Sequence, residues 1–158
     1  WLAWTLLEYW LHRAVFHLPG DTPARKVARF ILHTHHHRAP GDRRRLVATP
    51  FQGLSLALLL LGLDRLLAGP DAWRPLLAGQ LLGYLVYEAA HYRAHHARRA
   101  RRLGAALRRH HLRHHALGAG NYGISTRLWD LVFRTALPRA PAPPPREEAR
   151  GARAPGPP

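Results

Sequence analysis

The sequence predicts an all-α integral membrane protein with a helical cap that gathers histidines at one membrane face. Twelve of the thirteen histidines fall into four spaced clusters along the 158 residues. Long apolar blocks alternate with short arginine-rich blocks, a pattern typical of membrane proteins. The chain contains no cysteine, so any bound metal must be held by nitrogen or oxygen.

The first part of the chain predicts two helices separated by a break. Residues 1–18 are apolar and aromatic until Glu8 and the first histidines interrupt the run, as expected where a helix leaves the lipid. Residues 19–23 contain two prolines and a glycine, and Thr22 or Asp21 suits the N-cap of a second helix over residues 25–37. This second helix is basic at its start and rich in histidine at its end.

The middle of the chain predicts a transmembrane hairpin. Residues 46–67 form the most apolar segment, and the uncharged stretch 46–63 would span about 27 Å as a helix. A turn near residues 69–71 leads into a second apolar helix over residues 73–90. The alternative is a buried hairpin within a soluble helical bundle.

The remaining residues predict interfacial helices and a tail. Residues 91–117 are helical and strongly basic, 118–123 form a loop, and 124–137 form a short amphipathic piece. Residues 138–158 are rich in proline, alanine and arginine, which predicts a disordered tail. We therefore expect one domain over residues 1–137, truncated at its N-terminus because the chain begins within a helix.

A hairpin that crosses and returns places all four histidine clusters on one side of the membrane. The arginine-rich stretches 25–45 and 93–113 lie on that same side, which the positive-inside rule assigns to the cytoplasm. We therefore expect a multi-pass protein of a bacterial inner membrane, or of the endoplasmic reticulum in a eukaryote. The formal net charge of +15 would also suit nucleic acid, but the segregation of apolar and basic blocks favours an anionic lipid surface.

The histidines predict a site for two metal ions, because they are too many for a single ion. His33, His36 and His37 share one face of a helix. Histidines five residues apart lie about 140° apart on an α-helix, so the members of such a pair could serve different metals. The motif Glu88-x-x-His91 resembles a ligand motif of carboxylate-bridged di-iron bundles, but the further acids that such a site needs are lacking. Glu8 and Glu88 are instead expected to accept hydrogen bonds that orient imidazoles.

Taken together, residues 11–138 resemble the membrane fatty acid hydroxylase/sterol desaturase superfamily, and within it the fatty acid 2-hydroxylases. The family pattern HxxxxH, HxxHH, HxxxHH and HxxHH is matched by His12 and His17; His33, His36 and His37; His91, His95 and His96; and His111, His114 and His115. The short sequence segments around Pro40, Tyr84 and Trp129 also match the family's sequences. His35 and His110 are additional, and His110 leaves the register of the last motif open.

The resemblance implies a di-iron monooxygenase that uses O2 to hydroxylate C2 of a free or sphingolipid-linked acyl chain, with the eleven histidines of the pattern as metal ligands. In isolated protein, zinc is expected as an alternative occupant of the two iron sites. No catalytic residue beyond the ligands is expected. The resemblance also implies a lipid substrate from the bilayer. Because residues 1–158 show no cytochrome b5 segment, we expect the electrons to come from a separate cytochrome b5- or ferredoxin-like donor, or from a missing N-terminal part. The alternatives are a sterol or carotenoid hydroxylase or desaturase, and a non-catalytic membrane metal-binding protein; nucleic acid is not expected as a partner.

Overall fold

The computed structural model describes residues 1–44, 46, 48–97 and 102–138, and all regular structure in these ranges is helical. The segments are α1 (Leu2–Trp10), η1 (Leu11–Phe16), α2 (Pro23–Arg29), η2 (Phe30–Thr34), α3 (His35–Arg38), α4 (Pro50–Leu67), α5 (Gly69–His96), α6 (Arg102–Leu117) and α7 (Leu128–Val132). The segments η1 and η2 are π-helical. The predicted all-helical fold is confirmed, whereas the tail expected over residues 138–158 lies almost wholly outside the described residues.

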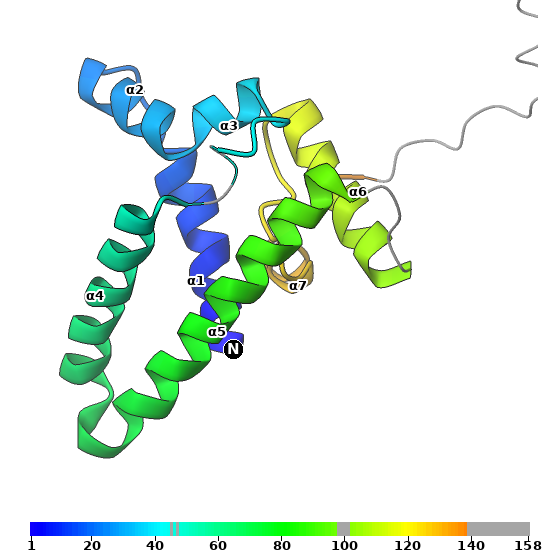
Figure 1. The fold of residues 1–158 in the computed structure, drawn as a ribbon. Coiled ribbons are helices and arrows are strands. Elements are labelled where there is room, and N and C mark those ends of the chain that lie inside the picture. Colours follow the sequence, from blue (N-terminus) through cyan, green and yellow to red (C-terminus); the bar gives the residue numbers. More distant parts are fainter. Residues whose placement is uncertain (45, 47, 98–101, 139–158) are drawn as a thin grey trace, which may run out of the picture.

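The helices α4 and α5 form a long hairpin that leads away from the other elements (Figure 1). Thr49 caps α4 through a reciprocal pair of hydrogen bonds with Gln52, and Pro50 occupies the first helical turn. The two helices join at Gly69, whose φ of +74° is accessible to glycine at little cost. The second helix is longer than expected, because α5 continues without a break to His96.

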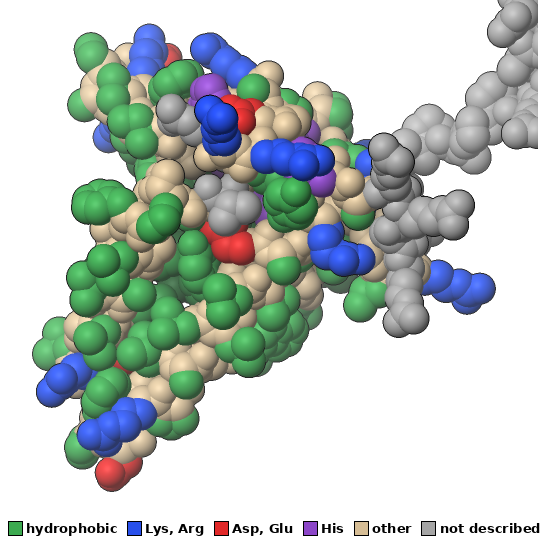
Figure 2. Space-filling view, in the orientation of Figure 1, with side chains coloured by type: hydrophobic (Ala, Val, Ile, Leu, Met, Phe, Trp, Pro, Cys, Tyr) green, Lys and Arg blue, Asp and Glu red, His purple; other side chains and the backbone are tan. Residues whose placement is uncertain are grey.

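The hairpin exposes a broad apolar surface. Helix α4 is long and apolar enough to cross a membrane, and only 11% of its most apolar window is buried. Exposed apolar side chains on the hairpin include Leu54, Leu58, Leu59, Leu63, Leu82, Leu85 and Val86. Figure 2 shows this apolar surface over the hairpin, with charged side chains at its tip and at the end that carries the histidines. A soluble protein rarely leaves so large a continuous apolar surface uncovered.

The N-terminal helix α1 packs against α5 through a close approach at one glycine. A Cβ atom built on Gly83 would lie 2.5 Å from the Trp4 side chain. Trp4 is itself 2% exposed, and its indole makes edge contacts with the rings of Tyr84 and Tyr87. The absence of a side chain at position 83 therefore sets the spacing between the two helices.

We expect Gly83→Ala to destabilise the protein by about 1–3 kcal/mol, because the added methyl group must displace the Trp4 ring. The matched control is Gly62→Ala in α4, where an added Cβ meets no atom within 4 Å and alanine favours the helix. Thermal unfolding of the purified variants measures both effects. Equal midpoints for the two variants would contradict this account of the α1–α5 contact.

Residues 23–38 form three consecutive helical segments, α2, η2 and α3, where one helix was expected. Thr22 caps α2, with its hydroxyl accepting a hydrogen bond from the Arg25 amide, and Pro23 stands at the first position, as the sequence predicts. The helix then widens into η2 before it ends as α3 at Arg38. In Figure 1 this helical arm lies at the end of the molecule opposite the tip of the α4–α5 hairpin.

Candidate metal centre

Ten histidines come together in two groups of five. The first histidine group comprises His12, His17, His33, His37 and His114, and the second comprises His36, His91, His95, His111 and His115. Within each group, one ring nitrogen from every member lies within 4.8 Å of all the others. Neither group is formed by a single helix, so the fold itself assembles both.

The two HxxHH motifs contribute to the two groups in opposite ways. The motif that ends η2 sends His33 and His37 to the first group and His36 to the second. The motif that ends α6 reverses this pattern, with His111 and His115 in the second group and His114 in the first. On an α-helix, residues four apart lie about 40° apart around the axis, whereas the histidine between them lies about 60° from one and about 100° from the other. The groups therefore interlock, and the rings of His37 and His115 stack across them at 4.2 Å.

The π-helical segment η1 explains why His12 and His17 join the same group. On an α-helix their separation would direct the two rings apart, which is why the sequence allowed them to serve different metals. In the structure the His17 amide donates to the His12 carbonyl oxygen at 3.2 Å, an i→i+5 bond. This wider turn brings residues five apart back to the same face. The α-helical assumption was therefore wrong for this pair.

The imidazole nitrogens of each group face one another at distances that suit a shared cation. In the first group, successive Nε2 atoms lie 2.9, 2.9, 3.1 and 3.0 Å apart along the series His12, His33, His37, His114 and His17. In the second group they lie 2.9, 3.0, 3.0 and 2.8 Å apart along the series His91, His36, His115, His111 and His95. Ligands about 2.1 Å from a metal and at right angles to each other would be about 3.0 Å apart. Both donor sets therefore fit a divalent transition metal.

Backbone carbonyls fix the tautomers of two members of the first group. The Nδ1 atom of His12 lies 2.6 Å from the Tyr122 carbonyl oxygen, and that of His114 lies 2.8 Å from the Gly120 carbonyl oxygen. Because a carbonyl oxygen only accepts, each Nδ1 carries the proton and each Nε2 presents a lone pair to the group. The loop after α6 thus prepares these two rings as metal ligands.

Asp130 holds that loop in place, a role that the sequence did not reveal. Its carboxylate accepts hydrogen bonds from the amides of Tyr122 and Gly123 and from the Thr135 hydroxyl, and it lies 2.8 Å from His110 Nε2. Burial alone would raise the pKa of Asp130, but the hydrogen bonds from His110, Thr135 and the two amides outweigh it and lower that pKa. The ionised carboxylate is therefore a fixed anchor. An acid within a short aromatic segment was the only signal in the sequence.

Burial keeps the clustered imidazoles neutral. Desolvation, followed by repulsion from neighbouring histidines, lowers the pKa of His36 and of His37 to about 3 and that of His115 to about 2. The pKa of His114 falls to about 4, although the Gly120 carbonyl opposes the shift. Neutral imidazole is the form that binds metal, so these rings are ready ligands at neutral pH.

The metal-free protein is expected to lose stability as the pH falls below 6.5. Unfolded histidines take up protons near pH 6.5, whereas His36, His37 and His115 in the folded chain do so only at much lower pH. Acid therefore protonates the unfolded state first and favours unfolding. Thermal unfolding of the chelator-treated protein between neutral pH and about pH 5 measures the effect. A midpoint that stays constant or rises over this range would contradict it.

The remaining histidines lie outside both groups. His96, a ligand by resemblance, contacts the ring of Tyr92 instead, with centroids 4.8 Å apart. His35 lies 3.5 Å from Asp42. His110 faces Asp130, so the last motif places His111, His114 and His115 in the groups, which is the register of the family pattern.

The two glutamates expected to orient imidazoles bond to backbone amides. Glu8 accepts hydrogen bonds from the amides of Ile124 and Ser125, both at 2.7 Å, and from the Ser125 hydroxyl. Glu88 accepts from the Ala48 amide at 3.2 Å. No hydrogen bond between either carboxylate and an imidazole is found among the described residues. The two acids instead anchor the segments that follow α6 and precede α4.

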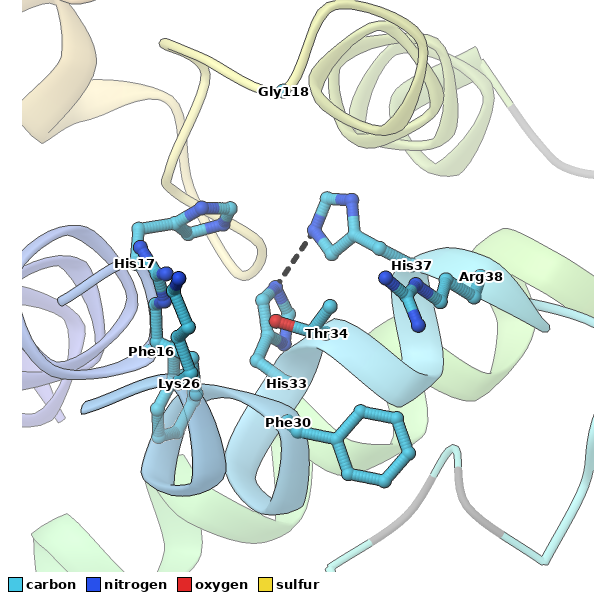
Figure 3. A pocket seen from close by; sticks show the side chains of 10 residues that line it. Phe16, His17, Lys26, Phe30, His33, Thr34, His37, Arg38 and Gly118 are labelled. Carbon is cyan, nitrogen blue, oxygen red and sulfur yellow. Dashed lines mark hydrogen bonds between the residues drawn. The ribbon is translucent and has the colours of Figure 1, made fainter. Parts of the chain in front are cut away.

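Two cavities border the histidine groups. The apolar cavity, about 610 Å³, lies among α1, η1, η2, α4 and α5, and His33, His36 and His91 form part of its wall. The basic pocket, about 590 Å³, is bounded by His17, His33 and His37 and by Lys26, Arg29 and Arg38 (Figure 3). Among the described residues, only Phe16 and His33 line both. The apolar cavity touches ligands of both groups, whereas the basic pocket touches the first group alone.

Comparison with known proteins places this arrangement in context. The family model described as fatty acid hydroxylase matches residues 1–135. A dihydroceramide fatty acyl 2-hydroxylase of Arabidopsis thaliana is 40% identical over 85% of this chain, and the human fatty acid 2-hydroxylase is 38% identical over 87% of it. The chain spans 57% of the plant relative and 38% of the human one. The solved structure of full-length scs7p, with only its hydroxylase domain visible, has a TM-score of 0.79 and 33% identity, and the match covers 87% of this chain and 53% of that one.

Proposed function

The chain belongs to the fatty acid hydroxylase family, and from this we propose that it hydroxylates a lipid acyl chain with O2, at C2 of a free or sphingolipid-linked fatty acid. One observation supports the proposal most strongly: two five-histidine groups border one apolar cavity. A cavity of this size accommodates a segment of acyl chain. Its contact with both groups brings that chain beside the metal ligands.

We propose that the two groups hold two iron ions. Each group offers five neutral nitrogen donors and no thiolate, a set that suits iron, zinc or copper, and zinc can occupy the same positions in isolated protein. When bound, iron would supply the activation of O2 that cleavage of an unactivated C–H bond requires. Insertion of one oxygen atom into C–H and release of the other as water consumes two electrons and two protons. A separate electron donor of the cytochrome b5 or ferredoxin class would supply the electrons.

The protein's own residues would hold the metals and exclude water. The carbonyls of Gly120 and Tyr122 fix His114 and His12, and Asp130 fixes the loop that carries those carbonyls. Apolar side chains of α4, including Leu56, form part of the cavity wall. This arrangement supports selective chemistry, because a dry, rigid cavity limits side reactions at a reactive centre.

We propose that α4 and the first part of α5 span the membrane as a hairpin, with the histidine groups at the cytoplasmic face. The apolar surface of the hairpin supports this arrangement, as does the concentration of arginine at the histidine end. The apolar cavity is lined by residues of α4, so a lipid could enter it from the bilayer. Residues 1–137 would form this hydroxylase domain.

The fatty acid profile of a host that expresses the encoding gene tests the function. The expected result is new 2-hydroxy fatty acids with the intact protein and with His35→Ala, which lies outside both groups. A hydroxylated sterol or carotenoid in place of these acids would leave the metal site standing and overturn the proposed substrate. Metal binding without any oxygen consumption, in the presence of lipid and reductant, would favour a metal-binding protein without catalysis.

A further inference from the structure

We propose that the basic pocket binds the anionic head of the lipid substrate, a carboxylate or a phosphate, while the acyl chain lies in the apolar cavity. This inference rests on the proposed function and extends it to the chemical class of the substrate head. It begins from the arrangement of the two cavities, which share Phe16 and His33. The Phe16 ring stacks on the His33 imidazole with centroids 5.4 Å apart, and a lipid that occupied both spaces would pass beside this ring pair.

The basic pocket carries an excess of positive charge. Lys26, Arg29 and Arg38 line it, and no acidic side chain of the described part of the chain does. In the view of Figure 3, Lys26 and Arg38 lie on either side of the His33 imidazole. Asp21 lies 3.9 Å from the Lys26 ammonium and 3.7 Å from the Arg29 guanidinium, so one acid offsets part of the three positive charges. Thr34 adds a hydroxyl to the wall. Such a set recognises a carboxylate or a phosphate through charge-assisted hydrogen bonds.

The apolar cavity is unsuited to an anion beside its two acidic side chains. Glu8 and Glu88 both line it. A substrate carboxylate placed beside these acids would lose its hydration and face like charge. Among the described residues, Arg44, an exposed residue, is the one basic side chain that lines this cavity. It offers the rival position for an anionic head.

The position of the reaction links the two cavities. In a free fatty acid C2 is adjacent to the carboxylate, so a C2 hydroxylase that binds this head close to its metals has the remaining chain extending away from the head. His33 belongs to the first histidine group and forms part of both walls. A head in the basic pocket and a chain in the apolar cavity would therefore place the first carbons of the chain beside the ligands.

Affinity measurements on the complete protein in nanodiscs of neutral lipid test the proposal. The probes are a long-chain fatty acid, an alkyl phosphate and a neutral fatty amide of equal length, each displacing a fluorescent lipid. We expect Lys26→Glu with Arg38→Glu to weaken binding of the acid or the phosphate by about tenfold or more, and to leave the amide within about twofold. The preferred anion distinguishes a carboxylate head from a phosphate head. Asp21→Asn should tighten binding of the same anion.

The matched control reverses two charges at the far end of the hairpin, Arg65→Glu with Arg74→Glu, and should leave all three affinities unchanged. Equal wild-type affinity for the anions and the amide would overturn the proposal. Loss of anion binding in Arg44→Glu but not in the Lys26/Arg38 variant would also overturn it, by placing the head at the apolar cavity. The assay measures binding and not turnover. A wild-type protein that makes 2-hydroxy acids but binds anions and the amide alike would refute only this inference.

Discussion

Replacing His36 with alanine is expected to abolish hydroxylation and to release metal from the second histidine group. The Nε2 atom of His36 lies 2.9 Å from that of His91 and 3.0 Å from that of His115. Its loss therefore removes the nitrogen donor between these two ligands. Loss of groups that merely orient ligands costs about 10- to 100-fold in metal affinity or activity, so loss of a ligand should cost more than about 100-fold. Metal analysis and product analysis of the purified variant measure both effects.

The neighbouring histidine provides the control for this prediction. His35 lies in the same short helix and faces Asp42, outside both groups, so His35→Ala should keep its metal and its activity. A fall in both variants would indicate general damage to α3. Full activity and full metal content in His36→Ala would show that the second group is not a metal site.

Replacing Asp130 with alanine is expected to disrupt the first histidine group without touching any ligand. The change leaves the buried amide of Gly123 and the ring of His110 without their partner, and removal of one partner of a buried charged network costs about 3–5 kcal/mol. The loop that carries the Gly120 and Tyr122 carbonyls would then no longer hold His114 and His12. We expect a lower unfolding temperature and reduced metal content.

The conservative variant Asp130→Asn distinguishes loss of the negative charge from loss of the whole side chain. Its amide keeps the volume and one acceptor oxygen, so we expect a smaller loss of stability than in Asp130→Ala. Metal content should fall from the first group and persist in the second, because no member of the second group contacts the loop carbonyls. Wild-type metal content in Asp130→Ala would contradict the anchoring role.

Much of the site could be predicted because the histidine spacing repeats the period of a helix. The i, i+3, i+4 pattern of His33, His36 and His37 predicts one shared face, and the structure shows how that face divides between two groups. The assignment of His12 and His17 could not be predicted, because nothing in their sequence indicates a π-helix. One extra residue per turn is enough to redirect a ring.

The groups that orient the imidazoles could not be predicted from the sequence, because they depend on tertiary contacts. Backbone carbonyls such as that of Tyr122 leave no trace in residue identity, and Asp130 reaches its amide partners only once the loop has folded. Glu8 and Glu88 followed a helical spacing that suited imidazoles, yet they bind amides of chain segments 40 or more residues away. The all-helical part of the fold class depended on local patterns alone, and the structure confirms it.

Isotope-labelled O2 tests most directly the central claim, which is O2-dependent hydroxylation at the histidine groups. Cells that express the gene are grown under labelled O2, and their acyl chains are analysed by mass spectrometry with His36→Ala as the inactive reference. The account predicts one labelled oxygen atom at C2 with the intact protein and none with the variant. A hydroxyl group that carries unlabelled oxygen, or an equal yield from His36→Ala, would contradict O2-dependent hydroxylation at the histidine groups.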